Sequence, residues 1–162
     1  MQVTLEQASR EDRIAADGLI HNYIDTMAQY INDGPFSDEQ QADAVALMNA
    51  YWEKEDHYPY LIFCDNELAG FSLVRRYPAD KQLFDMGQFF VANKFKRSGV
   101  GREALRLTLA KFPGDWIVRI LVDNVPAFGF WKKVIAEATQ DNFNLSLELD
   151  KSLQMHFFRF TV

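Results

Sequence analysis

A basic, glycine-containing segment in the middle of the chain constrains the fold more than any other feature. Residues 94–102 read Lys-Phe-Lys-Arg-Ser-Gly-Val-Gly-Arg, with four positive charges and no acid. A predicted strand around residues 83–91 precedes this segment, and apolar residues at helical spacing follow it until Pro113. A continuous apolar run with one charge, Arg119, covers residues 116–122 and comes next, as expected of a strand covered on both faces. This order predicts two parallel strands joined by a right-handed crossover.

The remaining segments predict further strands and helices around this unit. Helical periodicity covers residues 20–31, and a capping box at Ser37 and Gln40 begins a second helix that continues to about Trp52. Asn124 is expected to cap a helix that extends to residue 138. Alternating or apolar runs predict strands over residues 3–8, 60–64, 68–74, 144–149 and 155–160. The order predicts one α/β (α+β) domain over residues 1–162, with helices on both faces of a mixed sheet.

Composition restricts the class of protein and its partners. A chain of 162 residues that is 48% apolar can bury an ordinary core, while a net charge of −6 disfavours a nucleic-acid partner. The opening residues lack the pattern of a secretory signal, and no apolar run approaches the ~20 residues of a membrane helix. Cys64 is the only cysteine, so no internal disulfide can form. We therefore expect a cytoplasmic protein with no membrane partner.

Gly99 and Gly101 stand where the predicted strand ends and the next helix begins. A helix start exposes unpaired N–H groups and the positive end of the helix dipole, so it attracts anions. Glycine leaves the backbone open to a close phosphate, and the neighbouring cations add charge-assisted hydrogen bonds. The sequence therefore predicts a phosphate-binding loop, although no P-loop motif is present.

A dinucleotide is one candidate for the phosphate ligand. Residues 99–104 match G-x-G-x-x-G/A, and Asp123 lies where an acid that binds the ribose would stand. Two features count against this interpretation. Residues 94–98 separate the predicted strand from Gly99, and the roughly sixty residues after Gly101 are too few for the rest of that fold.

The same segment resembles the signature of the GNAT superfamily of N-acetyltransferases. That signature is Arg or Gln, two residues, Gly, one residue, then Gly or Ala, and here Lys96 stands in the first position before Gly99 and Gly101. A second family pattern, an Asn followed by an Ala and an aromatic pair, is matched by Asn124, Ala127 and the pair at 130–131. The resemblance covers the whole chain. It implies a single acetyltransferase domain with a central, mostly antiparallel sheet that contains one parallel, splayed strand pair.

The resemblance also implies acetyl-CoA as the cosubstrate. The pyrophosphate would lie against the loop backbone, the pantetheine arm would follow residues 89–91 as an extra strand, and a backbone N–H near Phe90 would stabilise the carbonyl oxygen. The residues implied to bind the cosubstrate are Phe89, Phe90, Val91, Lys96, Arg97, Ser98, Gly99, Val100, Gly101, Arg102, Asn124 and Trp131.

The catalytic residues stay unassigned, because two positions depart from the family pattern. Gln88 stands where many relatives have a Glu, and its amide cannot accept a proton. Trp131 stands where the family often has a Tyr, and an indole N–H is not a useful acid. Substitute bases are Asp85, Asp123 and His57, and substitute acids are Tyr58 and Tyr60. The three histidines show no metal-ligand spacing, so no metal is expected.

Three functions therefore remain open on the sequence. The first is an N-acetyltransferase that moves the acetyl group directly to a primary amine of a small-molecule or peptide acceptor. The second is a non-catalytic CoA-binding or regulatory module on the same fold, which the residues Gln88 and Trp131 suggest. The third is a dinucleotide-binding protein. The identity of the acceptor and the oligomeric state, including a homodimer, are left open.

Overall fold

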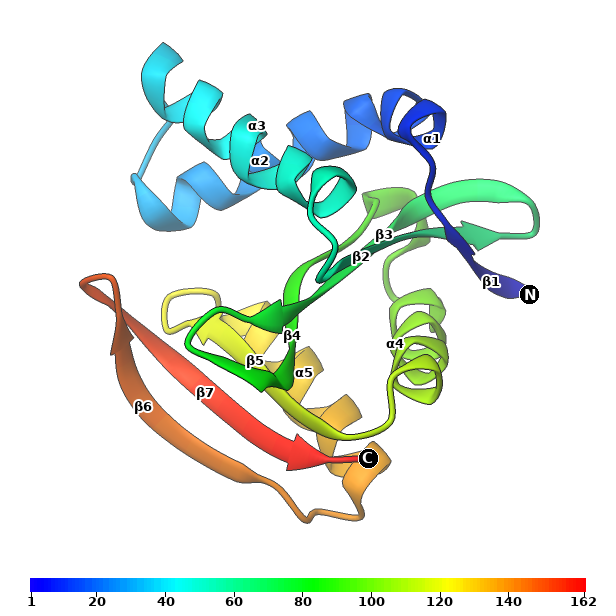
Figure 1. The fold of residues 1–162 in the computed structure, drawn as a ribbon, viewed down its shortest axis with the longest axis vertical. Helices are drawn as coiled ribbons and strands as arrows, with labels where there is room; N and C mark the ends of the chain where they lie inside the picture. The colour runs from blue at the N-terminus through cyan, green and yellow to red at the C-terminus, as the bar shows by residue number, and fades with distance from the viewer.

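The computed structural model describes residues 1–162, and its strands form one seven-stranded sheet (Figure 1). The strands are β1 (Val3–Gln7), β2 (His57–Cys64), β3 (Glu67–Tyr77), β4 (Asp80–Val91), β5 (Asp115–Leu121), β6 (Asn144–Asp150) and β7 (Leu153–Thr161). Their order across the sheet is β1-β2-β3-β4-β5-β7-β6. Neighbouring strands are antiparallel except for the parallel pair β4 and β5. The predicted mixed, mostly antiparallel sheet with one parallel pair is confirmed.

Helices cover both faces of this sheet, as predicted. They are α1 (Arg10–Ala15), α2 (Asp17–Ile31), α3 (Asp38–Glu53), a short 3-10 helix η1 (Asn93–Phe95), α4 (Val100–Lys111) and α5 (Val125–Thr139). In Figure 1, α1 to α3 lie on one side of the sheet and α4 and α5 on the other. None of them combines the length and the apolar character that crossing a bilayer requires.

Strand alternation divides the core between the two faces. Phe71 and Leu73 of β3 pack with Ile20, Ile24 and other residues of α2 and α3. Val74, the next residue on the opposite face, packs with the cluster that α4 and α5 cover. Trp116 of β5 is fully buried in that second cluster. The two clusters hold the two layers of helices on one continuous sheet.

The short helix α1 is an addition to the two N-terminal helices that the sequence predicts. Ser9 caps it: the Ser9 hydroxyl accepts the Asp12 N–H at 3.2 Å, and the Asp12 carboxylate accepts the Ser9 N–H at 2.7 Å. Only Ala16, which is fully buried, separates α1 from α2. The pair Ser9 and Asp12 has capping-box spacing in the sequence, so a signal for this helix was present.

The parallel pair β4 and β5 is short, and the two strands then separate. Phe84 pairs with Trp116 and Asp85 with Ile117, and no further pairs follow. A bulge comes next on β4, where Gly87 is the extra residue between the partners of Leu73 and Val74. Bulges bend the strand that carries them, so β4 turns away from β5 at this point. The splayed parallel pair is therefore confirmed.

This topology excludes the dinucleotide-binding alternative. That fold requires a doubly wound, mostly parallel sheet, with the glycine motif in the first strand-to-helix turn. Here one strand pair alone is parallel, and η1 lies between β4 and Gly99. The match of residues 99–104 to the dinucleotide motif is therefore a coincidence of spacing.

Close packing of β3 against β4 depends on Gly70, and this dependence can be tested. A Cβ on Gly70 would lie 1.9 Å from the Phe90 carbonyl oxygen, so Gly70→Ala must push the two strands apart. We expect a loss of about 1–3 kcal/mol in the free energy of unfolding, measured by urea denaturation. Gly129→Ala is the matched control, because Gly129 lies inside α5 with no atom within 4 Å of its added Cβ. It should gain about 1 kcal/mol, and equal stabilities for the two variants would contradict the packing argument.

Candidate active site

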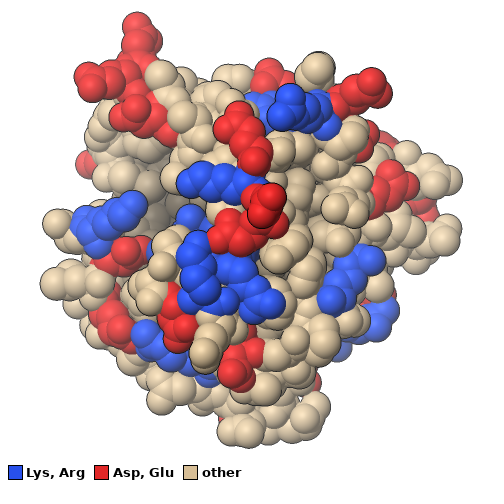
Figure 2. Space-filling view, viewed as in Figure 1, with Lys and Arg blue, Asp and Glu red and all other residues tan.

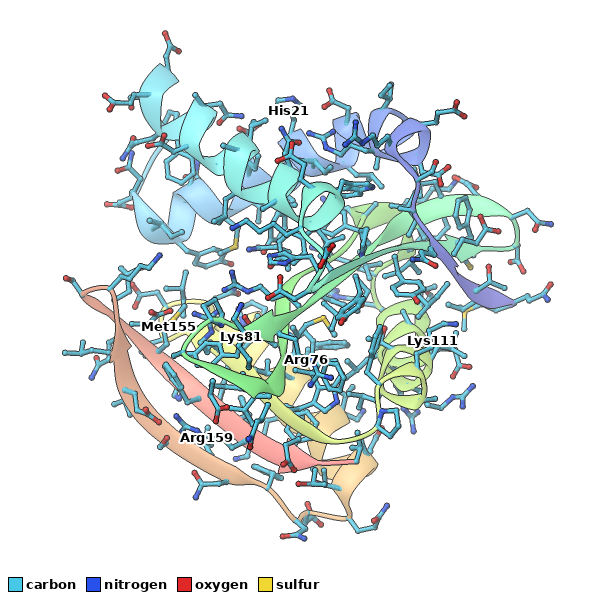
Figure 3. All side chains as sticks on the ribbon, in the orientation of Figure 1. His21, Arg76, Lys81, Lys111, Met155 and Arg159 are labelled. Atoms are coloured by element: carbon cyan, nitrogen blue, oxygen red, sulfur yellow. The ribbon has the colours of Figure 1, made fainter.

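The separation of β4 from β5 opens a cavity of about 480 Å³. Residues 86–89 of β4 form one wall and residues 118–121 of β5 the other. Tyr23 and Met27 of α2 and Leu47 of α3 close one side, and residues 150, 151 and 155 at the β6–β7 turn close the opposite side. Figure 2 shows a hollow between these two sides, with basic side chains beside it, and Figure 3 labels Met155 at its lower border.

One edge of β4 faces this cavity without a partner strand. The Ala92 N–H donates to the Ala69 carbonyl of β3 at 2.8 Å, so the Phe90 N–H points the same way by strand alternation. The N–H groups of Phe89 and Val91 consequently point away from β3, into the gap. A bound extended chain could pair with these groups as an additional strand.

The loop before α4 presents a row of free N–H groups. None of the N–H groups of residues 97–102 has an acceptor within the protein. Arg97 and Gly99 adopt left-handed conformations, with φ of 62° and 87°, and such residues are typical of backbone turns that bind anions. Consecutive free N–H groups at a helix N-terminus form a site for an anion. These are the residues at which the sequence predicts a phosphate-binding loop.

The cationic side chains of the loop have two different roles in the structure. Lys94 pairs with Glu67 at 2.6 Å and Arg102 pairs with Glu137 at 2.8 Å. Lys96 and Arg97 are exposed and have no acidic partner. The free positive charge of the loop therefore comes from Lys96 and Arg97, while Arg102 contributes its backbone N–H.

The remaining predicted residues lie where β4 meets α5. Gly101 is in close contact with α5, because an added Cβ would lie 3.2 Å from the ring of Phe130. Asn124 caps α5, accepting the Ala127 N–H at 3.3 Å, and also lines the cavity. Trp131 is mostly buried, and its ring lies edge-on to Phe89 at 5.2 Å.

Gln88 is held by Tyr23, a residue that no sequence pattern singles out. The Tyr23 hydroxyl donates to the Gln88 side-chain oxygen at 2.5 Å, which orients the amide at the cavity wall. Burial raises the pKa of Tyr23 far above its usual range. Burial likewise raises the pKa of Tyr51, whose ring packs beneath Gly87, to about 12. Neither tyrosine can act as a base near neutral pH.

A chain of ion pairs crosses the strands beside the cavity. Asp85 is fully buried, and its Oδ2 accepts the Arg75 Nε–H at 2.8 Å and an Arg119 Nη–H at 3.0 Å. Arg119 also donates to Asp150. Both arginines and Asp150 line the cavity, whereas Asp85 lies behind them. Two arginines thus share Oδ2 of Asp85 behind the cavity wall, and Asp85 itself does not line the cavity.

The other substitute acids and bases lie away from the cavity. His57 pairs with Asp56 at 2.7 Å, and burial lowers the pKa of its imidazole. Tyr58 and Tyr60 pack against Phe112 near the end of α4, and Asp123 is exposed after β5. None of these four residues lines the cavity. No group of three His, Cys, Asp or Glu side chains is arranged to hold a metal ion.

Known proteins share features of this chain in sequence and in fold. A family model described as the acetyltransferase (GNAT) family matches residues 24–135. No curated protein matches the chain. A solved acetyltransferase from Thermus thermophilus is similar over 100% of this chain and 98% of its own, with a TM-score of 0.72 and 14% identity.

Two solved structures with bound ligands are also similar in fold. Spermidine N-acetyltransferase from Vibrio cholerae, in complex with CoA and spermine, has a TM-score of 0.66 and 13% identity, with 99% of this chain and 95% of that chain covered. An acetyltransferase from Elizabethkingia anophelis with acetyl-CoA bound has a TM-score of 0.62 and 14% identity, with 99% and 98% covered.

The buried hydroxyl of Tyr23 gives a prediction about alkaline pH. At about one pH unit above the ordinary tyrosine pKa of about 10, folded wild type and Tyr23→Phe should show equal tyrosinate absorbance, because Tyr23 keeps its proton. When both proteins are unfolded in guanidinium chloride, the tyrosinate absorbance of Tyr23→Phe should be one sixth lower than that of the wild type, since the chain has six tyrosines.

The same protonation affects stability. Above about pH 10 the unfolded chain releases a proton that folded Tyr23 retains, so stability falls as pH rises, and Tyr23→Phe should show a smaller fall. A folded variant that already lacks one tyrosinate would show that Tyr23 ionises in place.

Proposed function

Because the chain belongs to the acetyltransferase (GNAT) family, we propose that it transfers the acetyl group of acetyl-CoA directly to a primary amine of a small-molecule or peptide acceptor. The observation that carries this proposal is the row of free N–H groups at residues 97–102 beside the open edge of β4. These two features are the ones that a diphosphate and an extended amide-containing arm require in one ligand.

The residues of the chain fit each part of that cosubstrate. The free N–H groups of the loop, together with Lys96 and Arg97, would hold the diphosphate. The outward N–H groups of Phe89 and Val91 would pair with the pantetheine arm, and Asn124 stands at the cavity wall beyond them. Gly101 allows α5 to approach the loop, which brings Phe130 and Trp131 beside β4.

Bound acetyl-CoA supplies a thioester carbonyl that a neutral amine can attack, with a C–N bond formed and the C–S bond broken. One outward backbone N–H of β4 near Phe90 would donate to the carbonyl oxygen as negative charge develops there. Gln88, fixed by Tyr23, can orient the amine or a water but cannot take its proton. We therefore propose that the proton leaves the amine through water in the cavity, and that the thiolate is protonated from solvent.

A non-catalytic CoA-binding module is the second candidate. The absence of a proton acceptor at Gln88 and of a hydroxyl at Trp131 favours it. We further propose a cytoplasmic location, since the single cysteine, Cys64, is buried and free. Turnover separates the two candidates: release of free thiol from acetyl-CoA with any member of a broad amine panel supports the enzyme, and cosubstrate binding without turnover supports the module.

Cosubstrate binding is tested by a pair of variants at Gly99. Acetyl-CoA at 100 times its Kd should stabilise the wild type by about 2.7 kcal/mol in thermal unfolding, and NADH should not stabilise it. Gly99→Glu places a carboxylate in the anion site and should abolish this stabilisation. Gly99→Asn is the matched control, because Asn tolerates the φ of 87° at this position and adds no charge.

Both variants must fold before the comparison counts, which their unfolding curves without ligand establish. Unchanged acetyl-CoA affinity in Gly99→Glu would show that the diphosphate binds elsewhere.

A further inference from the structure

The charged groups around the cavity are mostly basic, although the chain as a whole is acidic. Arg75, Arg119 and Lys151 line it, and Asp150 is the one acidic side chain among the lining residues. The buried Asp85 adds a second negative charge behind the wall. Three positive side chains and one negative side chain therefore line the cavity, with one negative charge buried behind them, in a protein whose net charge is −6.

Arg75 differs from Arg119 in the use of its guanidinium. Arg119 donates through both terminal nitrogens, one to Asp85 and one to Asp150. Arg75 donates only its Nε–H, to Asp85. Its two terminal nitrogens have no acceptor in the protein, and the side chain is 18% exposed where it lines the cavity. Asp85 thus fixes the plane of the Arg75 guanidinium. The two terminal nitrogens, which form the outer edge of that guanidinium, stay available to a ligand.

The outer edge of a guanidinium matches a carboxylate, which it binds through two parallel hydrogen bonds. The Arg75 group is already oriented and partly desolvated, so the contact would be stronger than a surface ion pair. A polycation would meet Arg75, Arg119 and Lys151 instead, which is unfavourable. The surroundings of Arg75 therefore favour an anionic group on the acceptor.

The position of Arg75 on the sheet sets the size of that acceptor. Arg75 pairs with Asp85, which lies four residues before Phe89 on β4. One of these four residues is the bulged Gly87, so the span is about three strand steps, roughly 10 Å, and the arginine side chain covers part of this distance. An amine at Phe89 and a carboxylate at Arg75 would fit a molecule between an amino acid and a short peptide in length.

We propose that the acceptor is a primary amine that also bears a carboxylate, and that Arg75 is the residue that selects it. This proposal rests on the proposed acetyl transfer, and it adds the class of acceptor. Lys151, at the turn between β6 and β7, adds positive charge at the cavity border.

The first experiment compares acceptors that differ only in the carboxylate. The panel contains L-amino acids, their carboxamides and the corresponding decarboxylated amines, with thiol release from acetyl-CoA as the readout and rates expressed per neutral amine. A second set compares peptides that begin with Asp or Glu with peptides that begin with Asn or Gln. We expect about 10- to 100-fold higher kcat/KM for the carboxylate member of the preferred pair, which is the usual effect of a hydrogen-bonded charge.

The two sets distinguish the source of the carboxylate. Preference within the first set identifies free amino acids as the class, and preference within the second set alone identifies acidic peptide N-termini. Equilibrium binding of the same pairs to the CoA-loaded protein is measured in parallel, so that the carboxylate contact is tested without turnover.

A variant pair on β3 assigns the effect to Arg75. Arg75→Gln should remove most of the carboxylate preference, chiefly through KM. Arg76→Gln is the matched control, because Arg76, which is labelled in Figure 3, points to the opposite face from Arg75. Its guanidinium lies 3.8 Å from the centre of the Phe84 ring. If Arg75→Gln does not fold, the double variant Arg75→Gln/Asp85→Asn replaces it. The double variant removes the buried Asp85 carboxylate together with its partner Arg75, so no buried charge is left without that partner.

The outcomes separate this inference from acetyl transfer itself. Turnover of amines with no preference for carboxylates, or equal preference in Arg75→Gln and wild type, overturns the assignment and leaves the acetyltransferase proposal standing. Carboxylate-dependent binding without turnover supports Arg75 and contradicts catalysis. If no carboxylate-bearing amine binds or reacts, the proposed acceptor class is wrong.

Discussion

The early separation of β4 from β5 is the constraint on which the rest of the structure depends. The strands share two paired positions and then diverge at the bulge formed by Gly87. Gly87 is required because the Tyr51 hydroxyl occupies the space that a side chain would need. The divergence leaves backbone groups of β4 unpaired beside a cavity, which is tolerable only where solvent or a ligand can satisfy them.

The site combines an anion cradle made by the backbone with a cavity defined by side chains. Gly99 and Gly101 shape the first, since one allows the left-handed turn and the other the contact with Phe130. Tyr23, Arg75 and Arg119 shape the second, and each is held by a partner on a neighbouring element. The cradle would serve any CoA ligand, whereas the cavity side chains would determine the acceptor. The two functions are therefore separable by mutation.

The loop was predictable because its pattern is local. Residues 94–102 carry their glycines and cations in one continuous stretch, and the free N–H groups follow from the start of a helix. The cavity was not predictable in this way. Tyr23, Arg75, Arg119 and Asp150 lie on four elements far apart in the sequence, and no spacing links them. The one available signal was Arg119, which interrupts the apolar run of β5, because Arg75 follows the apolar run of β3 and stands beside a second arginine, Arg76.

The sequence by itself determined the order of the strands and of the long helices, the two-faced core, the basic glycine loop and the resemblance to one enzyme family, because periodicity, capping and turn chemistry act over a few residues. Only the tertiary structure decided which side chains meet at the cavity. It placed Asp85 between two arginines, paired Tyr23 with Gln88 and kept His57, Tyr58 and Tyr60 away from the cavity. The physical reason is that strand register and the bulge at Gly87 set these contacts, and both depend on packing between segments distant in the chain.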